Sequence, residues 1–374
     1  MINFAKNLSD KGLQYWLLNY IWQSIKSNRN CTVDGPIHVI LCIVDHFEPF
    51  TGGVGFERAQ FRINSWVERY SRLGNIHKDA DNRKPQHTWF YPPHHDQSFL
   101  SDLVKLCAEG LGEIEMHLHH NHMRPFPDTS RSLKKKIMTC IEAYSRHGIF
   151  CSIDGRKNFG FIHGDWSLDN SGGDHICGVN DEISILRDCG CYADFTFPSL
   201  GRTQPRMINK IYYATDNTRK PKSYDTGKEL VAGRQESGDL LMIPGIIGLR
   251  WHSRARLFKL SIESSNLDKH DIPTERRINY WVRNGLTIKG GPRWEFIKLH
   301  THGAREDTWD VLLGKDADNM FSYFESKFNN NCDYVLHYVT AREMYNIIKA
   351  AEAGCKGDPN SYRDYIIKPY IYSR

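Results

Sequence analysis

The chain of 374 residues is long enough to bury a large core, and 40% hydrophobic with 25% charged residues is the composition of a globular protein. The formal net charge of only +5, without a long basic run, argues against nucleic acid as a partner. Ten scattered cysteines form neither a disulfide framework nor paired zinc-finger spacings. Disordered, nucleic-acid-binding and disulfide-stabilised classes are therefore disfavoured.

Residues 1–30 are predicted to form an N-terminal amphipathic helix. Apolar side chains recur there at helical spacing, including Leu13, Trp16 and Leu17. Polar residues interrupt every apolar run, so we expect no signal peptide and no transmembrane span, and a cytoplasmic protein. We expect the helix to pack on the rest of the chain or on a partner, with membrane-surface contact as the alternative. The oligomeric state is left open.

Residues 31–374 are predicted to form a single α/β domain in which strands and helices alternate. The predicted strands lie in GPIHVILCIVDHF, QHTWFYPP, EIEMHLH, NFGFIHGD, CYADFTFPS, DLLMIPGI and WEFIKLHTHG, and the predicted helices lie at 57–73, 99–108, 133–147 and 180–188. Such alternation indicates a parallel sheet or barrel. A polar stretch at 205–238 is expected to leave the barrel, with one strand in INKIYYATD, and 308–345 is expected to be helical.

The C-terminal ends of these strands share an unusual content of histidine and carboxylate. They read VDHFEP, FYPPHH, MHLHHNH, IHGDW, ADFTFPS and KLHTHG. In a parallel barrel the loops at this end of the strands build the ligand-binding face. Neutral imidazole with carboxylate is the usual ligand set of zinc and other first-row divalent ions. The sequence therefore predicts a divalent-metal site at this face.

The segment GEIEMHLHHNH supplies the first candidate ligands. His117 and His119 point to the same face of a strand, so both can coordinate one metal ion. His120 and His122 lie where the strand gives way to a loop, and they stay open as alternatives for the second histidine ligand.

The first and last strand ends supply further candidates. A carboxylate such as Asp45 or Glu48 can bind the metal or act as general base toward metal-bound water. In a closed barrel the last strand lies beside the first, so we expect His300 and His302 to face Asp45. One of these two histidines is a natural general acid.

In this order, the motifs resemble the polysaccharide deacetylase superfamily over about residues 37–304. The resemblance implies a distorted (β/α) barrel. IVDHFEP is similar to an early Asp pair, which implies Asp45 as catalytic base and His46 or Glu48 in place of the second, metal-binding Asp. GEIEMHLHHNH is similar to the next motif and implies His117 as a ligand. Where the family has a second histidine this chain has Asn121, so the second ligand is reassigned to His119, or to His120 or His122.

Two later motifs complete the resemblance. FIHGDWSLDNS falls where the family has an arginine–proline loop at the substrate site, and the arginine is absent. Position alone thus implies Asp165, Trp166 and Asn170 as substrate contacts. KLH resembles the motif of the last strand and implies His300 as the catalytic acid.

Together these residues lead us to expect an α/β protein with a distorted (β/α) barrel of about seven parallel strands. The expected activity is removal of an N-acyl group from an amino sugar or glycan, in cell-surface glycan biosynthesis. One divalent ion, zinc by preference, would be bound by His46, Glu48, His117 and His119, with Asp45 as base and His300 as acid. The alternatives are an amidohydrolase- or phosphoesterase-like metal hydrolase and a non-catalytic carbohydrate-binding barrel.

Overall fold

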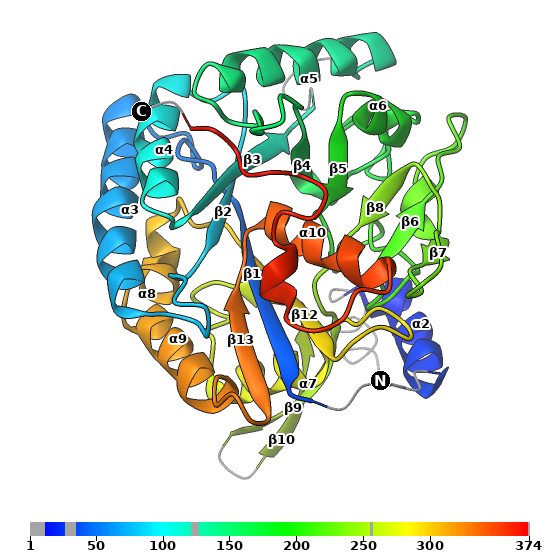
Figure 1. The fold of residues 1–374 in the computed structure, drawn as a ribbon. Coiled ribbons are helices and arrows are strands. Elements are labelled where there is room, and N and C mark those ends of the chain that lie inside the picture. The colour runs from blue at the N-terminus through cyan, green and yellow to red at the C-terminus, as the bar shows by residue number, and fades with distance from the viewer. Residues whose placement is uncertain (1–11, 27–34, 121–126, 255–256, 373–374) are drawn as a thin grey trace.

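A computed structural model describes residues 12–26, 35–120, 127–254 and 257–372 (Figure 1). Its central feature is a sheet whose principal strands are parallel. From one edge the order is β11 (Asn266–Leu267), β12 (Trp294–Thr301), β1 (Ile37–His46), β2 (His87–Tyr91), β3 (Gly112–Leu118), β4 (Phe159–His163), β5 (Cys191–Asp194) and β8 (Leu240–Met242). Each of these pairs in parallel with its neighbours. The predicted α/β class, built on parallel strands, is confirmed.

The apolar composition of the strands follows from their burial on both faces. Every residue of β2, β3, β4 and β12 is buried, and so are the last eight residues of β1. Strands of a parallel sheet that is covered on both sides read as nearly continuous apolar runs. The polar exceptions are therefore informative, and several of them, such as Asp45 and His117, lie at or near the C-terminal ends.

Helices follow most of the strands, and most of these helices surround the sheet. They are α3 (Phe56–Ile76), α4 (Leu100–Ala108), α5 (Ser130–Ser145), α6 (Glu182–Asp188), α7 (Glu275–Arg283), α8 (Trp309–Leu312), α9 (Lys315–Phe328) and α10 (Ala341–Glu352). Figure 1 shows α3, α4, α8 and α9 along one side, with α5 and α6 continuing around the molecule. Thr129 and Thr340 begin α5 and α10 with capping boxes, which satisfy free backbone N–H groups of the first turn.

The C-terminal part departs from its predicted helical character. Between α9 and α10 lies β13 (Tyr334–Tyr338), which pairs in parallel with the N-terminal half of β1. A five-residue strand between two longer helices gives a period-two pattern too short to outweigh the helical signal around it. The hairpin of β9 (Gly248–Arg254) and β10 (Leu257–Glu263) was also not predicted.

The excursion at 205–238 adds two antiparallel strands beyond β8. These are β6 (Tyr212–Ala214), which coincides with the strand expected in INKIYYATD, and β7 (Gly227–Glu229). The N-terminal helix α2 (Leu13–Lys26) packs beside this region, because Trp16 is fully buried against Ile208 and Ile247. None of the helices formed by the described residues is long and apolar enough to cross a membrane.

Candidate functional site

The register of β1 with its neighbours brings the first and last strand ends together. Asp45 lies opposite Thr301 of β12 and Trp89 of β2. The expected adjacency of the first and last long strands is therefore confirmed. Side chains from residues 45–48, 117–119 and 300–302 consequently share one rim of the sheet.

Asp45 is fully buried, and both of its carboxylate oxygens accept hydrogen bonds. Nε2 of His87 lies 2.9 Å from Oδ2, and the backbone N–H of Gly303 donates to Oδ1 at 2.6 Å. A Cβ atom on residue 303 would lie 2.2 Å from Oδ2, so this close approach requires glycine. Asp45 therefore ties together β1, β2 and the loop after β12. Its role as base stays a prediction.

Three of the predicted ligands converge on one point. Oε1 of Glu48 lies 2.9 Å from Nε2 of His119 and 3.8 Å from Nε2 of His117. One ligand atom of each residue lies within 4.8 Å of the others, the spacing of groups that can share a metal ion. We call Glu48, His117 and His119 the open cluster, because Glu48 and His119 remain partly exposed.

The second ring nitrogen of each histidine in the open cluster has its own partner. Nδ1 of His117 donates to the carbonyl oxygen of Ile162 at 3.0 Å, and Nδ1 of His119 lies 3.4 Å from Oδ2 of Asp165. Such outer partners fix ring orientation and tautomer. Both rings therefore turn Nε2 toward Glu48.

Burial and charge give the members of the open cluster different pKa values. Burial, aided by the charge of His119, lowers the pKa of His117 to about 3. Burial alone would lower the pKa of His119, but Asp165 and Glu48 together raise it to about 9. Burial would likewise raise the pKa of Glu48, but the hydrogen bond from His119 and the nearby imidazoles hold it well below its usual range. Without a metal, a Glu48 carboxylate thus faces a protonated His119.

The fourth predicted ligand, His46, lies beside the open cluster. Its ring centre is 5.0 Å from that of His117 and 4.6 Å from that of His302, with which it stacks. Burial lowers the pKa of His46 well below its usual range, so its ring is neutral. His302, rather than the predicted acid His300, makes this ring contact; the backbone N–H of His300 donates to Ser265, and its Nδ1 has no hydrogen-bond partner.

The three predicted substrate contacts fall in two places. Asp165 contacts His119 with a side chain that is 47% exposed, and the ring of Trp166 lies 5.7 Å from that of His46. Asn170 instead holds its own loop: its amide donates to Asp174 and Asn180 and accepts from Gly178 N–H. Asp165, Trp166 and Asn170 all have positive φ, a conformation that bulky residues rarely adopt and that often marks functional loops.

The remaining candidates for the second histidine ligand do not join the open cluster. His122 lies outside the described residues. His120 turns the other way, into a second group with His163, Cys177 and Glu182, which we call the closed cluster because all four side chains are buried. Cys177 and Glu182 were not among the predicted site residues; the sequence shows only a cysteine five residues before a glutamate that begins a predicted helix.

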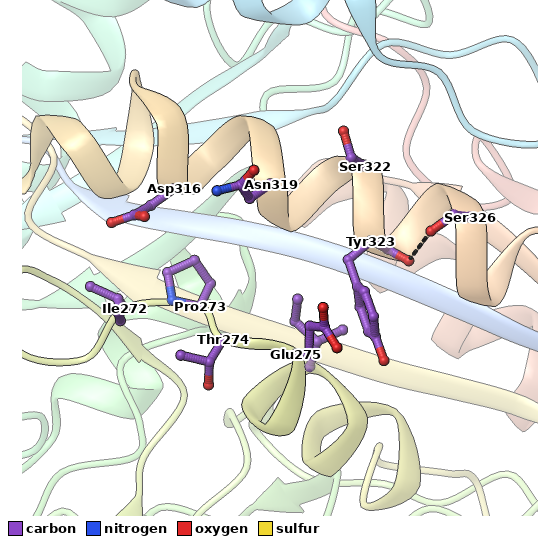
Figure 2. Close-up of a pocket in the computed structure, with 10 residues that line it drawn as sticks. Ile272, Pro273, Thr274, Glu275, Asp316, Asn319, Ser322, Tyr323 and Ser326 are labelled. Carbon is purple, nitrogen blue, oxygen red and sulfur yellow. Dashed lines mark hydrogen bonds between the residues drawn. The ribbon is translucent and has the colours of Figure 1, made fainter.

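A groove of about 630 Å³ lies between α7 and α9 (Figure 2), and none of the residues that line it belongs to either cluster. Pro273, Thr274 and Glu275 line one side, and Asp316 and Tyr323 line the other. None of the predicted site residues borders it. The groove therefore adds nothing to the candidate site.

Comparisons with known proteins give structural likenesses only. No protein-family model and no curated protein matches the sequence. The structure is similar to 4-alpha-glucanotransferase from Thermococcus litoralis (12% identity, TM-score 0.41, 83% of this chain and 40% of that chain). It is also similar to an alpha-mannosidase from Enterococcus faecalis V583 (10% identity, TM-score 0.45, 86% of this chain and 30% of that chain). A third similar structure is a GH57 branching enzyme from Thermococcus kodakaraensis (9% identity, TM-score 0.37, 81% of this chain and 72% of that chain). The chain thus spans less than half of the first two proteins.

These comparisons correct the expected family and activity. The similar structures are enzymes of glycosidic bonds, whereas none of the three is a deacetylase. Membership of the polysaccharide deacetylase superfamily is therefore wrong, and so are N-acyl hydrolysis at a carbon–nitrogen bond and an acylated amino sugar as substrate. The amidohydrolase, phosphoesterase and non-catalytic alternatives gain no support. The apparent motifs reflect the way any parallel barrel delivers polar residues to one rim, and fold does not determine function.

Proposed function

We propose that the open cluster binds one divalent metal ion and that the chain uses this centre to act on a glycosidic bond of a carbohydrate. The observation that carries the proposal is the convergence of Glu48, His117 and His119 on one point. Two imidazoles and one carboxylate are a common ligand set of catalytic metal centres, in which a further position stays available for water or substrate. Among the residues that the structure describes, this group has three members.

The partners of the two imidazoles support the same proposal. Ile162 and Asp165 occupy the Nδ1 atoms of His117 and His119, so both Nε2 atoms are turned toward Glu48. A metal ion would take the place of the proton that His119 now shares with Glu48. Nε2 of His117, which is fully buried and has no hydrogen-bond partner, would gain one ligand bond.

The surroundings of the open cluster suit a hydroxyl-rich substrate. A bound metal ion would supply Lewis-acid polarisation of a substrate oxygen or of water. The half-exposed Asp165 can hydrogen-bond a sugar hydroxyl, and Trp166 offers an aromatic face beside His46 and His302. Burial lowers the pKa of His302, so its neutral ring can accept a proton from the reacting groups. The reaction class that we propose is therefore cleavage or transfer of a glycosidic bond.

The metal is tested first and by itself. Protein purified without chelator is analysed for bound metals, and metal affinity is measured for wild type, Glu48→Gln and His119→Gln. His270→Gln is the matched control, because His270 is exposed and outside both clusters. We expect each cluster variant to lose more than about tenfold in affinity at this site. Unchanged affinity in both variants would refute the metal centre.

The activity is tested on a panel of α- and β-linked oligosaccharides and aryl glycosides, by release of reducing sugar or of the aryl group. We expect turnover that chelation removes, that added metal restores and that Glu48→Gln abolishes. Turnover that persists in chelator would contradict the proposal, as would a metal-loaded protein inactive on every glycoside of the panel.

A further inference from the structure

The closed cluster gathers metal-ligating side chains from four segments of the chain. His120 follows β3, His163 ends β4, Cys177 lies in the loop before α6, and Glu182 is the first residue of α6. All four are buried, the most exposed being His120 at 7%. Their ligand atoms lie within 4.8 Å of one another.

The four donor atoms face a common centre. Nε2 of His120 is 2.9 Å from Oε1 of Glu182 and 3.8 Å from Sγ of Cys177. Oε2 of Glu182 is 3.7 Å from the same sulfur and 3.5 Å from Nε2 of His163. Four donors around a tetrahedral metal ion lie at comparable mutual distances, because each of them is about 2.0–2.3 Å from the metal.

Outer partners hold these side chains in their orientations. Nδ1 of His120 lies 3.2 Å from Oδ2 of Asp128, which also accepts from Lys136 at 2.5 Å. Nδ1 of His163 donates to the carbonyl oxygen of Gly164 at 2.5 Å. A carboxylate or carbonyl that engages the second nitrogen of an imidazole is the usual outer shell of a histidine ligand.

Protein atoms alone leave part of this cluster unsatisfied. If His120 is protonated, its two ring N–H groups are paired with the carboxylates of Asp128 and Glu182. Nε2 of His163, however, is fully buried with no hydrogen-bond partner. The Cys177 sulfur has contacts of 3.7–3.8 Å to His120, Glu182 and the carbonyl oxygen of Val179. An unpaired buried polar atom destabilises the fold, and a central metal ion would remove that cost.

We propose that the closed cluster is a structural zinc site, with Nε2 of His120 and His163, the thiolate of Cys177 and a carboxylate oxygen of Glu182 as the four ligands. On binding, the thiol proton and the extra imidazole proton pass to solvent. The thiolate and the carboxylate then neutralise the ion. A thiolate favours zinc over magnesium or calcium, and four protein ligands close the site to substrate.

The zinc site fixes the loop that carries Asp165 and Trp166, because its ligands His163 and Cys177 lie at the two ends of that loop. The site thereby joins the ends of β3 and β4 to α6. This inference does not depend on the function proposed for the open cluster.

Cobalt substitution of the whole protein tests the site directly. Co²⁺ bound to a thiolate gives a sulfur-to-metal charge-transfer band in the near ultraviolet, and the open cluster contains no sulfur ligand. We expect wild type to show this band, Cys177→Ser to lose it, and Cys140→Ser to keep it. Cys140 is the matched control, since it is equally buried but lies on α5 outside the cluster.

Zinc stoichiometry separates the two proposals. We expect Cys177→Ser and His163→Gln to lose one bound ion per chain while Glu48→Gln keeps the ion of the closed cluster together with the cobalt band. If Glu48→Gln also leaves the total metal content unchanged, the open-cluster proposal fails and the zinc site stands. The zinc site is refuted if the wild-type protein takes up cobalt without showing the band, or takes up no cobalt at all. This result comes from the wild type alone, so it does not depend on whether the variants fold.

Discussion

The open and closed clusters are built from the same types of side chain but differ in solvent exposure. Each has two imidazoles and a glutamate, and in each one imidazole is oriented by an aspartate while the other is oriented by a backbone carbonyl. They differ in a fourth donor, the thiol of Cys177, and in access: the Asp165 side chain is 47% exposed, and the Asp128 side chain is fully buried. If the two proposals hold, one added donor and the loss of solvent access are what distinguish the structural site from the reactive one.

Two consecutive residues of the chain belong to different clusters. His119 belongs to the open cluster and His120 to the closed one. Successive side chains of an extended segment point to opposite sides, so neighbours in sequence serve different sites. A histidine-rich strand end can thus supply two centres at once.

The largest expected difference between the clusters is in stability. Glu182→Gln removes one partner from a fully buried group of charges, which costs about 3–5 kcal/mol in the free energy of unfolding. Glu48→Gln removes a partner of His119 that is 18% exposed, and we expect a smaller loss of about 1.5–3 kcal/mol, the worth of a hydrogen bond to a charged group. Urea denaturation at fixed pH measures both values. Equal losses would show that the open cluster is as much a structural element as the closed one.

The next largest effect concerns the two orienting aspartates. We expect Asp165→Asn and Asp128→Asn each to weaken metal binding at their own cluster by about 10- to 100-fold, because an outer carboxylate orients the imidazole and raises its basicity. Competition with a chromophoric chelator gives the affinities, and the cobalt charge-transfer band identifies the closed cluster. A variant that weakens metal binding at the other cluster as strongly as at its own would contradict two independent sites.

The pH dependence of metal binding sharpens the comparison further. The pKa of His119 is raised to about 9, above its usual 6.5, so its interactions stabilise the metal-free protein fully below pH 6.5, and this contribution is lost as pH rises through 9. Over the same range the open cluster must release one proton to bind metal, which gives a rise in affinity of about tenfold per pH unit.

The closed cluster should respond more steeply. Burial raises the pKa of Cys177, and Glu182 and Asp128 outweigh burial to raise that of His120, so two protons leave on binding. We expect affinity there to rise by about a hundredfold per pH unit near neutrality. Metal titrations at three pH values compare the slopes. Identical slopes would mean that Cys177 does not enter as a thiolate.

The sequence was sufficient for the parallel strands and for the first members of the site. Continuous apolar runs that end in polar residues located β1 to β5, β8 and β12, and period-two alternation placed His117 and His119 on one face. Glu48 was among the predicted ligands for a similar reason, since it directly follows a buried strand. These features depend on local spacing, which a single sequence shows.

The closed cluster could not be predicted because its members meet only through tertiary packing. Cys177 and Glu182 lie 57 and 62 residues from His120. A lone cysteine in an apolar stretch is usually a small core residue, and a glutamate in the first turn of a helix is usually a favourable charge there. The motif resemblance failed for a related reason: the order of strand ends is shared by any barrel, while the chemistry depends on which side chains converge.

The smallest expected effect tests whether the open cluster faces a sugar. Trp166 lies beside His46 and His302, but contributes no ligand atom. For a glycoside that the wild type turns over, we expect Trp166→Ala to raise KM about three- to tenfold, the worth of one aromatic contact, with metal content unchanged. Trp166→Phe keeps an aromatic face and should recover most of the loss. A fall in kcat or in bound metal instead of a rise in KM would mean that Trp166 shapes the cluster itself, which would remove the main support for a carbohydrate at this rim.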